Sequence, residues 1–119
     1  MPFTKDKKIG TRYKEMKLFV DDLRKPPEGW ELARTNTDAI KVLSMGLVEE
    51  ISLDHDIIFT TQEESVIVGH YSEETFQPIA YYIALMEKKP KVLFHTANIE
   101  AGRDMADTIG CQFDYWWIE

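Results

Sequence analysis

Three short apolar segments of this chain end in polar, titratable residues, and this pattern constrains the fold more than any other feature. The segments are 17–20, 51–53 and 91–94, and the residues that follow them are Asp21 and Asp22, then Asp54, His55 and Asp56, then His95. Parallel strands of an open α/β sheet are apolar on both faces, and such sheets bind ligands at the carboxyl ends of their strands. The pattern therefore predicts three strands whose ends share one site.

The order of the predicted elements is that of an α/β protein. Strands are predicted over 16–20, 31–34, 50–53, 91–94 and 112–118, and helices over 38–45, 75–88 and 98–109. Pro26, Pro27 and Gly29 follow the first strand and exclude a regular helix there. Strands that alternate with helices favour a parallel sheet with right-handed crossovers. We expect a flavodoxin-like, doubly wound, mostly parallel five-stranded sheet of order 2-1-3-4-5, in which the first helix is degraded.

Two segments are predicted to lie outside this sheet. Residues 1–15 are rich in lysine and poor in apolar residues, so we expect a basic, flexible N-terminal arm ahead of a single domain over 16–119. Residues 57–74 form an insertion after the third strand, either a hairpin or a flap, and a hairpin over the site is favoured because long structureless loops are uncommon in compact domains.

Charge and composition limit the classes of partner. The net charge of −7 argues against a broad nucleic-acid-binding surface. No apolar run approaches the roughly 20 residues that span a bilayer, so no membrane partner is expected. Cys111 is the only cysteine, which favours a reducing compartment. We therefore expect a cytoplasmic protein whose oligomeric state the sequence leaves open.

The acidic residues at the strand ends form a candidate metal site. In the predicted strand order the first and third strands are neighbours, so Asp21, Asp22, Asp54 and Asp56 converge. Carboxylates that close together need a counter-charge, and Mg²⁺ held by one to three carboxylates is the simplest one, with Mn²⁺ or Zn²⁺ as alternatives. The competing interpretation is that a pair of aspartates after a strand forms an ordinary turn.

Histidines and phosphate-binding candidates surround the same edge. His55 and His95 follow neighbouring strands and could act as general base and general acid, because histidine titrates near neutral pH, or as ligands of a softer metal. Arg24, Asn98 and Arg103 could bind a phosphate. The alternatives are hydrogen-bonding histidines, an N-cap at Asn98 and a surface ion pair at Arg103.

The motifs resemble a known family. The aspartates resemble the acidic pocket of two-component receiver domains, but His95 stands where a receiver has Ser or Thr, and the receiver's lysine is missing. The chain is more similar to cyclic-phosphate processing receiver domains, a divergent receiver-like group. The matching motifs are Asp21-Asp22-Leu23-Arg24, Pro26-Pro27-Glu28-Gly29-Trp30, Ser52-Leu53-Asp54-His55-Asp56, His95-Thr96-Ala97-Asn98 and Gly102-Arg103 with Met105. The resemblance implies a receiver-like fold and the processing of cyclic phosphates, such as the 2′,3′-cyclic phosphate of cleaved RNA.

The leading hypothesis is a metal-dependent phosphoesterase whose substrate is a cyclic phosphate at an RNA end or in a nucleotide. Asp54, His55 and His95 are the catalytic candidates, and Asp21, Asp22, Asp54 and Asp56 are the metal ligands. Two alternatives stay open: a non-catalytic receiver-like module that binds a nucleotide or a protein, and a receiver that accepts a phosphoryl group on Asp54.

Overall fold

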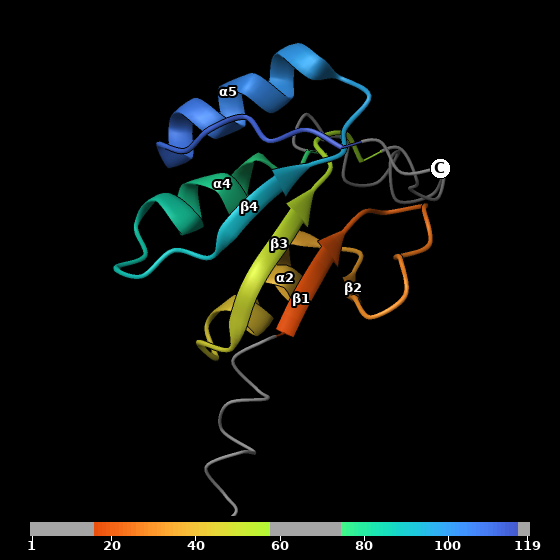
Figure 1. Ribbon diagram of the computed structural model, residues 1–119, viewed down its shortest axis with the longest axis vertical. Helices are drawn as coiled ribbons and strands as arrows, with labels where there is room; N and C mark the ends of the chain where they lie inside the picture. The colour runs from red at the N-terminus through yellow and green to blue at the C-terminus, as the bar shows by residue number, and fades with distance from the viewer. Residues whose placement is uncertain (1–15, 58–74, 117–119) are drawn as a thin grey trace, which may run out of the picture.

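Four parallel strands form the sheet in the computed structural model, which describes residues 16–57 and 75–116. The strands are β1 (Met16–Val20), β2 (Glu31–Ala33), β3 (Val48–Leu53) and β4 (Lys91–Phe94), and the helices are α2 (Asn36–Leu43), α4 (Gln77–Ala84) and α5 (Ile99–Ile109). The sheet order is β2-β1-β3-β4, and every pairing is parallel. Figure 1 shows the carboxyl ends of β1, β3 and β4 pointing the same way. The parallel α/β architecture and the order of the first four strands are confirmed.

A fifth strand over 112–118 is not confirmed. Within the described residues this segment pairs with β4 through one parallel bridge between Phe94 and Tyr115. Two backbone hydrogen bonds of 2.8 Å make the bridge, from Phe94 N–H to Asp114 and from Trp116 N–H to Phe94. A longer pairing was predicted because the segment 112–118 is dense in aromatic residues, which are common in strands. In the structure those side chains pack on one another instead, with the rings of Phe113 and Tyr115 stacked at 5.7 Å.

The main apolar core lies between one face of the sheet and the helices. Alternate residues of each strand point to this face, because side chains of a strand alternate between faces. The strand members are Leu18, Val20, Ile51, Leu53, Val92 and Phe94, and buried residues of α2, α4 and α5 complete the same cluster. Figure 1 shows α2 and α4 behind the sheet in this view. Helix packing on this face therefore fixes the strands whose ends carry the polar residues.

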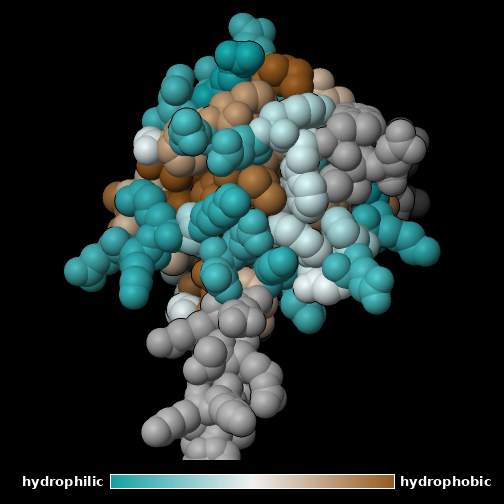
Figure 2. Space-filling model, in the orientation of Figure 1, coloured by the Kyte–Doolittle hydropathy of each residue, from teal (hydrophilic) through white to brown (hydrophobic). Residues whose placement is uncertain are grey.

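Phe19 and Ser52 lie on the opposite face of the sheet, where the side chains of Trp30 and Trp116 cover them. Phe19 is fully buried and lies against Trp30 at 6.3 Å between ring centroids, and Trp30 lies 5.3 Å from Trp116. The predicted degradation of the first helix explains this arrangement, since Trp30 ends the proline-rich loop that replaces it. Figure 2 shows hydrophilic side chains along the lower part of the molecule in this view and an apolar area around α5 and β4. A doubly wound sheet carries helices on both faces. In the described residues, α2, α4 and α5 all contribute to the core on one face, and the aromatic side chains cover the other.

The helix ends follow local sequence signals. Thr35 caps α2 by accepting a hydrogen bond from Asp38 N–H at 3.1 Å, and Asn98 caps α5. Gly110 ends α5 with a φ of 86°, a left-handed conformation that glycine adopts without strain. Helix α4 is shorter than the predicted 75–88. Its last turn tightens at Leu85, whose N–H bonds to Tyr82 three residues back rather than four.

Two predicted segments lie outside the described residues. These are the basic arm over 1–15 and nearly all of the 57–74 insertion, of which Ile57 alone is described. The insertion is bordered by an antiparallel bridge between Asp56 and Thr75. Among the described residues, no helix combines the length and apolar character that crossing a membrane requires.

Candidate functional site

The ends of β1, β3 and β4 bring Asp21, Asp54 and His95 together. The backbone pairing continues one residue past the strands, with hydrogen bonds of 3.1 Å from Asp54 N–H to Val20 and 3.0 Å from His95 N–H to Leu53. All three side chains are buried, and one ligand atom from each lies within 4.8 Å of the others. The side chains meet because the register of the sheet places the residues after the strands side by side.

Asp21 accepts four hydrogen bonds. Its Oδ1 accepts from the backbone N–H groups of Leu23 at 2.8 Å and Arg24 at 2.9 Å, and its Oδ2 accepts from Arg24 Nη1 and His95 Nε2, both at 3.0 Å. Burial alone raises the pKa of Asp21, but the hydrogen bonds from His95 and the two N–H groups outweigh it and hold that pKa well below its ordinary value. Asp21 is therefore ionised and serves as the fixed negative charge of the site.

Asp54 has the opposite electrostatic environment. Burial raises its pKa, and the negative charge of Asp21 adds to that effect, against the hydrogen bond of 2.7 Å that Asp54 Oδ1 accepts from His55 N–H. Arg24 Nη1 lies 3.8 Å from Asp54 Oδ2, so one guanidinium faces both carboxylates. The two aspartates thus differ: Asp21 is held in its charged form by its donors, whereas burial disfavours the charged form of Asp54.

His95 is fixed by a chain of hydrogen bonds that begins at Trp116. Trp116 Nε1–H donates to Ser52 Oγ at 2.7 Å, and that oxygen lies 2.7 Å from His95 Nδ1. A carboxylate only accepts, so His95 Nε2–H donates to Asp21, while His95 Nδ1 and the Ser52 hydroxyl share the second hydrogen bond. The imidazole is fully buried and stacks on Phe19 at 4.2 Å. Both ring nitrogens of His95 are therefore engaged, Nε2 with Asp21 and Nδ1 with Ser52.

His55 lies beside Asp54 but points to another partner. Its Nδ1 is 2.7 Å from Asp56 Oδ1, and 15% of its side chain is exposed. Because the carboxylate is an acceptor, Nδ1 carries the hydrogen, and Nε2 is left able to accept a proton. The backbone of His55 is held by Phe76, whose N–H donates to the His55 carbonyl at 2.8 Å. His55 and Asp56 form the oriented histidine–carboxylate pair that acid–base chemistry needs.

The other predicted site residues are placed around this centre. Asp22 is buried next to Asp21, but neither Asp22 nor Asp56 belongs to the group of ligand atoms within 4.8 Å. Asn98 Oδ1 accepts from Ala101 N–H at 3.2 Å as the cap of α5, and the Arg103 guanidinium lies 5.4 Å from the centroid of the Phe113 ring. Metal binding by Asp22 and Asp56 and phosphate binding by Asn98 and Arg103 stay predictions.

Sequence reasoning missed the roles of Ser52 and Trp116. A serine between the apolar residues Ile51 and Leu53, two residues before Asp54, was a usable signal, since buried hydroxyl groups almost always have a hydrogen-bond partner. The partnership with Trp116 spans 64 residues and leaves no trace in local spacing.

The donor set fits a hard divalent cation. Two carboxylates with a buried histidine beside them supply the kind of oxygen ligands that Mg²⁺ prefers. Asp21 and Asp54 would hold the ion. Arg24 would compete with such an ion, because its guanidinium already faces both carboxylates.

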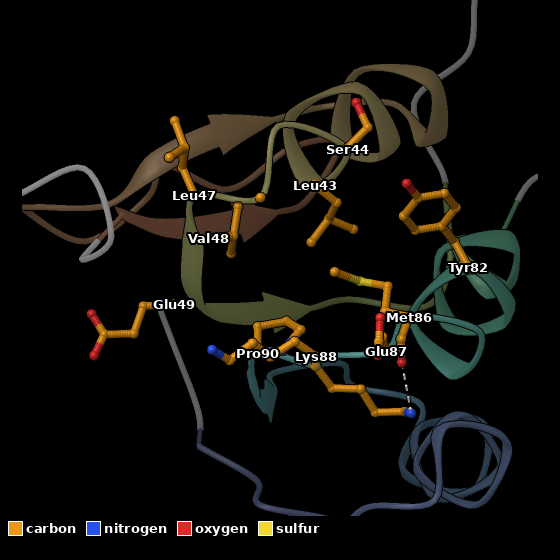
Figure 3. Close-up of a pocket in the computed structure, with 12 residues that line it drawn as sticks. Leu43, Ser44, Leu47, Val48, Glu49, Tyr82, Met86, Glu87, Lys88 and Pro90 are labelled. Atoms are coloured by element: carbon orange, nitrogen blue, oxygen red, sulfur yellow. Dashed lines mark hydrogen bonds between the residues drawn. The ribbon is translucent and has the colours of Figure 1, made fainter. Parts of the chain in front are cut away.

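A cavity of about 530 Å³ opens at the other edge of the sheet. Figure 3 shows it between the C-terminal parts of α2 and α4 and the start of β3, where Leu43, Val48 and Met86 are among the residues that face it. Its charged lining residues are all exposed, namely Glu49, Glu87, Lys88 and Lys89. The cavity therefore lacks the buried titratable groups that the carboxyl edge provides.

Replacing Asp54 by asparagine is expected to stabilise the metal-free protein by about 0.5–2 kcal/mol at pH 7. A carboxyl whose pKa is raised by folding stabilises the fold at low pH and loses that contribution as the pH rises through its pKa. The stabilisation by Asp54→Asn should therefore fade toward pH 3. Urea unfolding in EDTA at both pH values measures it, and a variant less stable than the wild type at pH 7 would show that Asp54 is not electrostatically disfavoured.

The chain matches a known protein family over the residues that form the sheet and the site. A family model described as cyclic-phosphate processing receiver domain matches residues 16–110, which include all the strands and helices described above. No curated protein matches the chain significantly. Trp116 lies beyond the matched range, so the hydrogen bond that it donates to Ser52 comes from outside the family match.

Proposed function

The chain belongs to the family of cyclic-phosphate processing receiver domains, and from this premise we propose that it is a metal-dependent phosphoesterase that opens cyclic phosphates. The substrate class is a 2′,3′-cyclic phosphate at an RNA end or in a nucleotide. The observation that carries the proposal is the buried group of Asp21, Asp54 and His95 with the His55–Asp56 pair directly beside it. Such a centre combines a place for a cation with a group that can move a proton.

Ring opening requires water to attack phosphorus while one ester bond breaks. A P–O bond forms to the water oxygen, and the bond from phosphorus to one sugar oxygen breaks. His55 Nε2 accepts the proton of the attacking water, while the hydrogen bond from Nδ1 to Asp56 stabilises the imidazolium that results. The proton then passes from His55 to the leaving sugar oxygen, which completes the hydrolysis to a phosphomonoester.

The remaining residues orient the reacting groups. Asp21 and Asp54 would hold a divalent cation, which would supply Lewis-acid polarisation of the phosphoryl oxygens. His95 acts as a positioning residue in this proposal rather than as the general acid, because its two ring nitrogens face Asp21 and Ser52 and its side chain is fully buried. Arg24 is the first candidate to bind the phosphate, and Asn98, which caps α5, and Arg103, within α5, are further candidates.

Hydrolysis of a 2′,3′-cyclic nucleotide, followed by ³¹P NMR, tests the proposal. We expect a phosphomonoester with Mg²⁺ or Mn²⁺ and none with EDTA. Absence of turnover with cyclic nucleotides and with RNA that ends in a cyclic phosphate would contradict it and favour a non-catalytic binding module. Incubation with a small phosphodonor separates the third hypothesis, since a receiver would become labelled on Asp54.

A further inference from the structure

The Arg24 side chain lies where a cation is needed. Its Nη1 is 3.0 Å from Asp21 Oδ2 and 3.8 Å from Asp54 Oδ2, and it approaches the His95 carbonyl at 3.5 Å. One guanidinium thus supplies the positive charge that two buried carboxylates require. This contact is what the sequence-based argument for a metal left out, because it treated Arg24 as a phosphate ligand alone.

An incoming metal ion has to replace one of the existing partners of Asp21. A carboxylate offers about four lone-pair sites, and Asp21 already accepts four hydrogen bonds. Two come from the backbone of the loop after β1, and one comes from His95, which is fully buried and held by Ser52. The fourth comes from the Arg24 side chain, which is 25% exposed. Arg24 is therefore the partner that can move away without breaking the loop or the core.

We propose that Arg24 is a placeholder cation that a divalent metal displaces, and that the displaced guanidinium then binds the substrate phosphate. The inference rests on the proposed function, since it deepens the account of the same site. A +2 ion held by Asp21 and Asp54 would replace the ion pairs that Arg24 makes with these two carboxylates, and its charge would repel the guanidinium. A guanidinium released at the rim of the site is well suited to a phosphate, because it can donate two parallel hydrogen bonds to it. Metal binding thus precedes and prepares phosphate binding.

The proposal predicts effects of opposite sign when Arg24 is replaced. Arg24→Gln is expected to bind Mg²⁺ about tenfold more tightly in calorimetric titration, because the ion no longer competes with a charge-assisted hydrogen bond. The same variant, saturated with Mg²⁺, is expected to bind inorganic phosphate about tenfold more weakly than the wild type. A residue that merely stabilised the loop would weaken both ligands.

Arg34→Gln is the matched control. Arg34 Nη1 donates to the backbone carbonyls of Asp21 at 3.3 Å and Arg24 at 3.2 Å, so this variant removes an equal charge from the same loop without touching the two carboxylates. Its Mg²⁺ affinity should change by less than about twofold, since exposed charges contribute little. An equal gain in both variants would reduce the effect to net charge and overturn the proposal.

Wild-type protein provides a second measurement that does not depend on a variant. In ¹H–¹⁵N spectra, we expect the Arg24 guanidinium signals to show hindered rotation without metal and averaged signals with saturating Mg²⁺. Suppose instead that Mg²⁺ binds without changing the Arg24 signals, and that Arg24→Gln binds it with wild-type affinity. That result would overturn the proposed role of Arg24 as a placeholder but would leave the metal site in place. Absence of Mg²⁺ binding in wild type and variant alike overturns the metal site itself, and the placeholder with it.

Discussion

Asp21→Asn is expected to lower the free energy of unfolding by about 3 kcal/mol at pH 7 and to abolish Mg²⁺ binding. Asp21 is 1% exposed and accepts charge-assisted hydrogen bonds from Arg24 and His95. An amide removes the charge and turns one acceptor into a donor that faces other donors, so the buried partners lose their acceptor. Urea unfolding of the metal-free variant measures the loss.

The pH dependence of this loss has a definite sign. Folding holds the pKa of Asp21 below its ordinary value of 3.8, so its stabilising contribution is complete above that value and is lost as the pH falls through the lower folded pKa. The difference between wild type and Asp21→Asn should therefore shrink below pH 3.8. Asp104→Asn, an exposed carboxylate on α5, is the control and should change stability by less than about 0.5 kcal/mol. Equal stability of Asp21→Asn and wild type would contradict the picture of Asp21 as the fixed charge of the site.

His55→Ala is expected to lower kcat for a 2′,3′-cyclic nucleotide by about 10²–10⁴-fold, because that is the usual contribution of a positioned general acid–base group. Mg²⁺ binding should be unchanged, since His55 is outside the group of ligand atoms within 4.8 Å. Steady-state kinetics at saturating Mg²⁺ measures the change.

Asp56→Asn is the matched control for this prediction. It keeps the imidazole but replaces the acceptor of the 2.7 Å hydrogen bond that orients it, so a smaller loss of kcat is expected. If His55→Ala kept the wild-type kcat, the proton transfer would have to be reassigned to another residue, and the division of roles between His55 and His95 would be wrong.

The sequence predicted the parts of the fold that depend on local pattern. Apolar segments that end in polar residues identified β1, β3 and β4, and the cap at Asn98 identified the start of α5. The fifth strand is not confirmed. The aromatic residues that suggested it pack on other rings, Phe113 on Phe94 and Trp116 on Trp30, and the segment makes one bridge to β4.

The candidate site was predicted in its location more than in its contacts. Strand order alone implied that the residues after β1, β3 and β4 would meet, and the structure brings Asp21, Asp54 and His95 together. The position of Arg24 between two carboxylates and the engagement of His95 by Ser52 depend on side-chain directions and on contacts between distant segments. No spacing rule in a single sequence reports such contacts, so the sequence left open whether His95 moves a proton, binds a metal or makes hydrogen bonds.

The most direct test of the central claim is to locate a bound ion in solution. Substoichiometric Mn²⁺ should broaden the backbone amide signals of Asp21, Asp54 and His95 before all others, because paramagnetic broadening falls steeply with distance from the ion. Selective broadening at those three strand ends is the predicted result. Broadening that begins instead at exposed carboxylates such as Glu49 or Glu87, at the opposite edge of the sheet, would contradict the account.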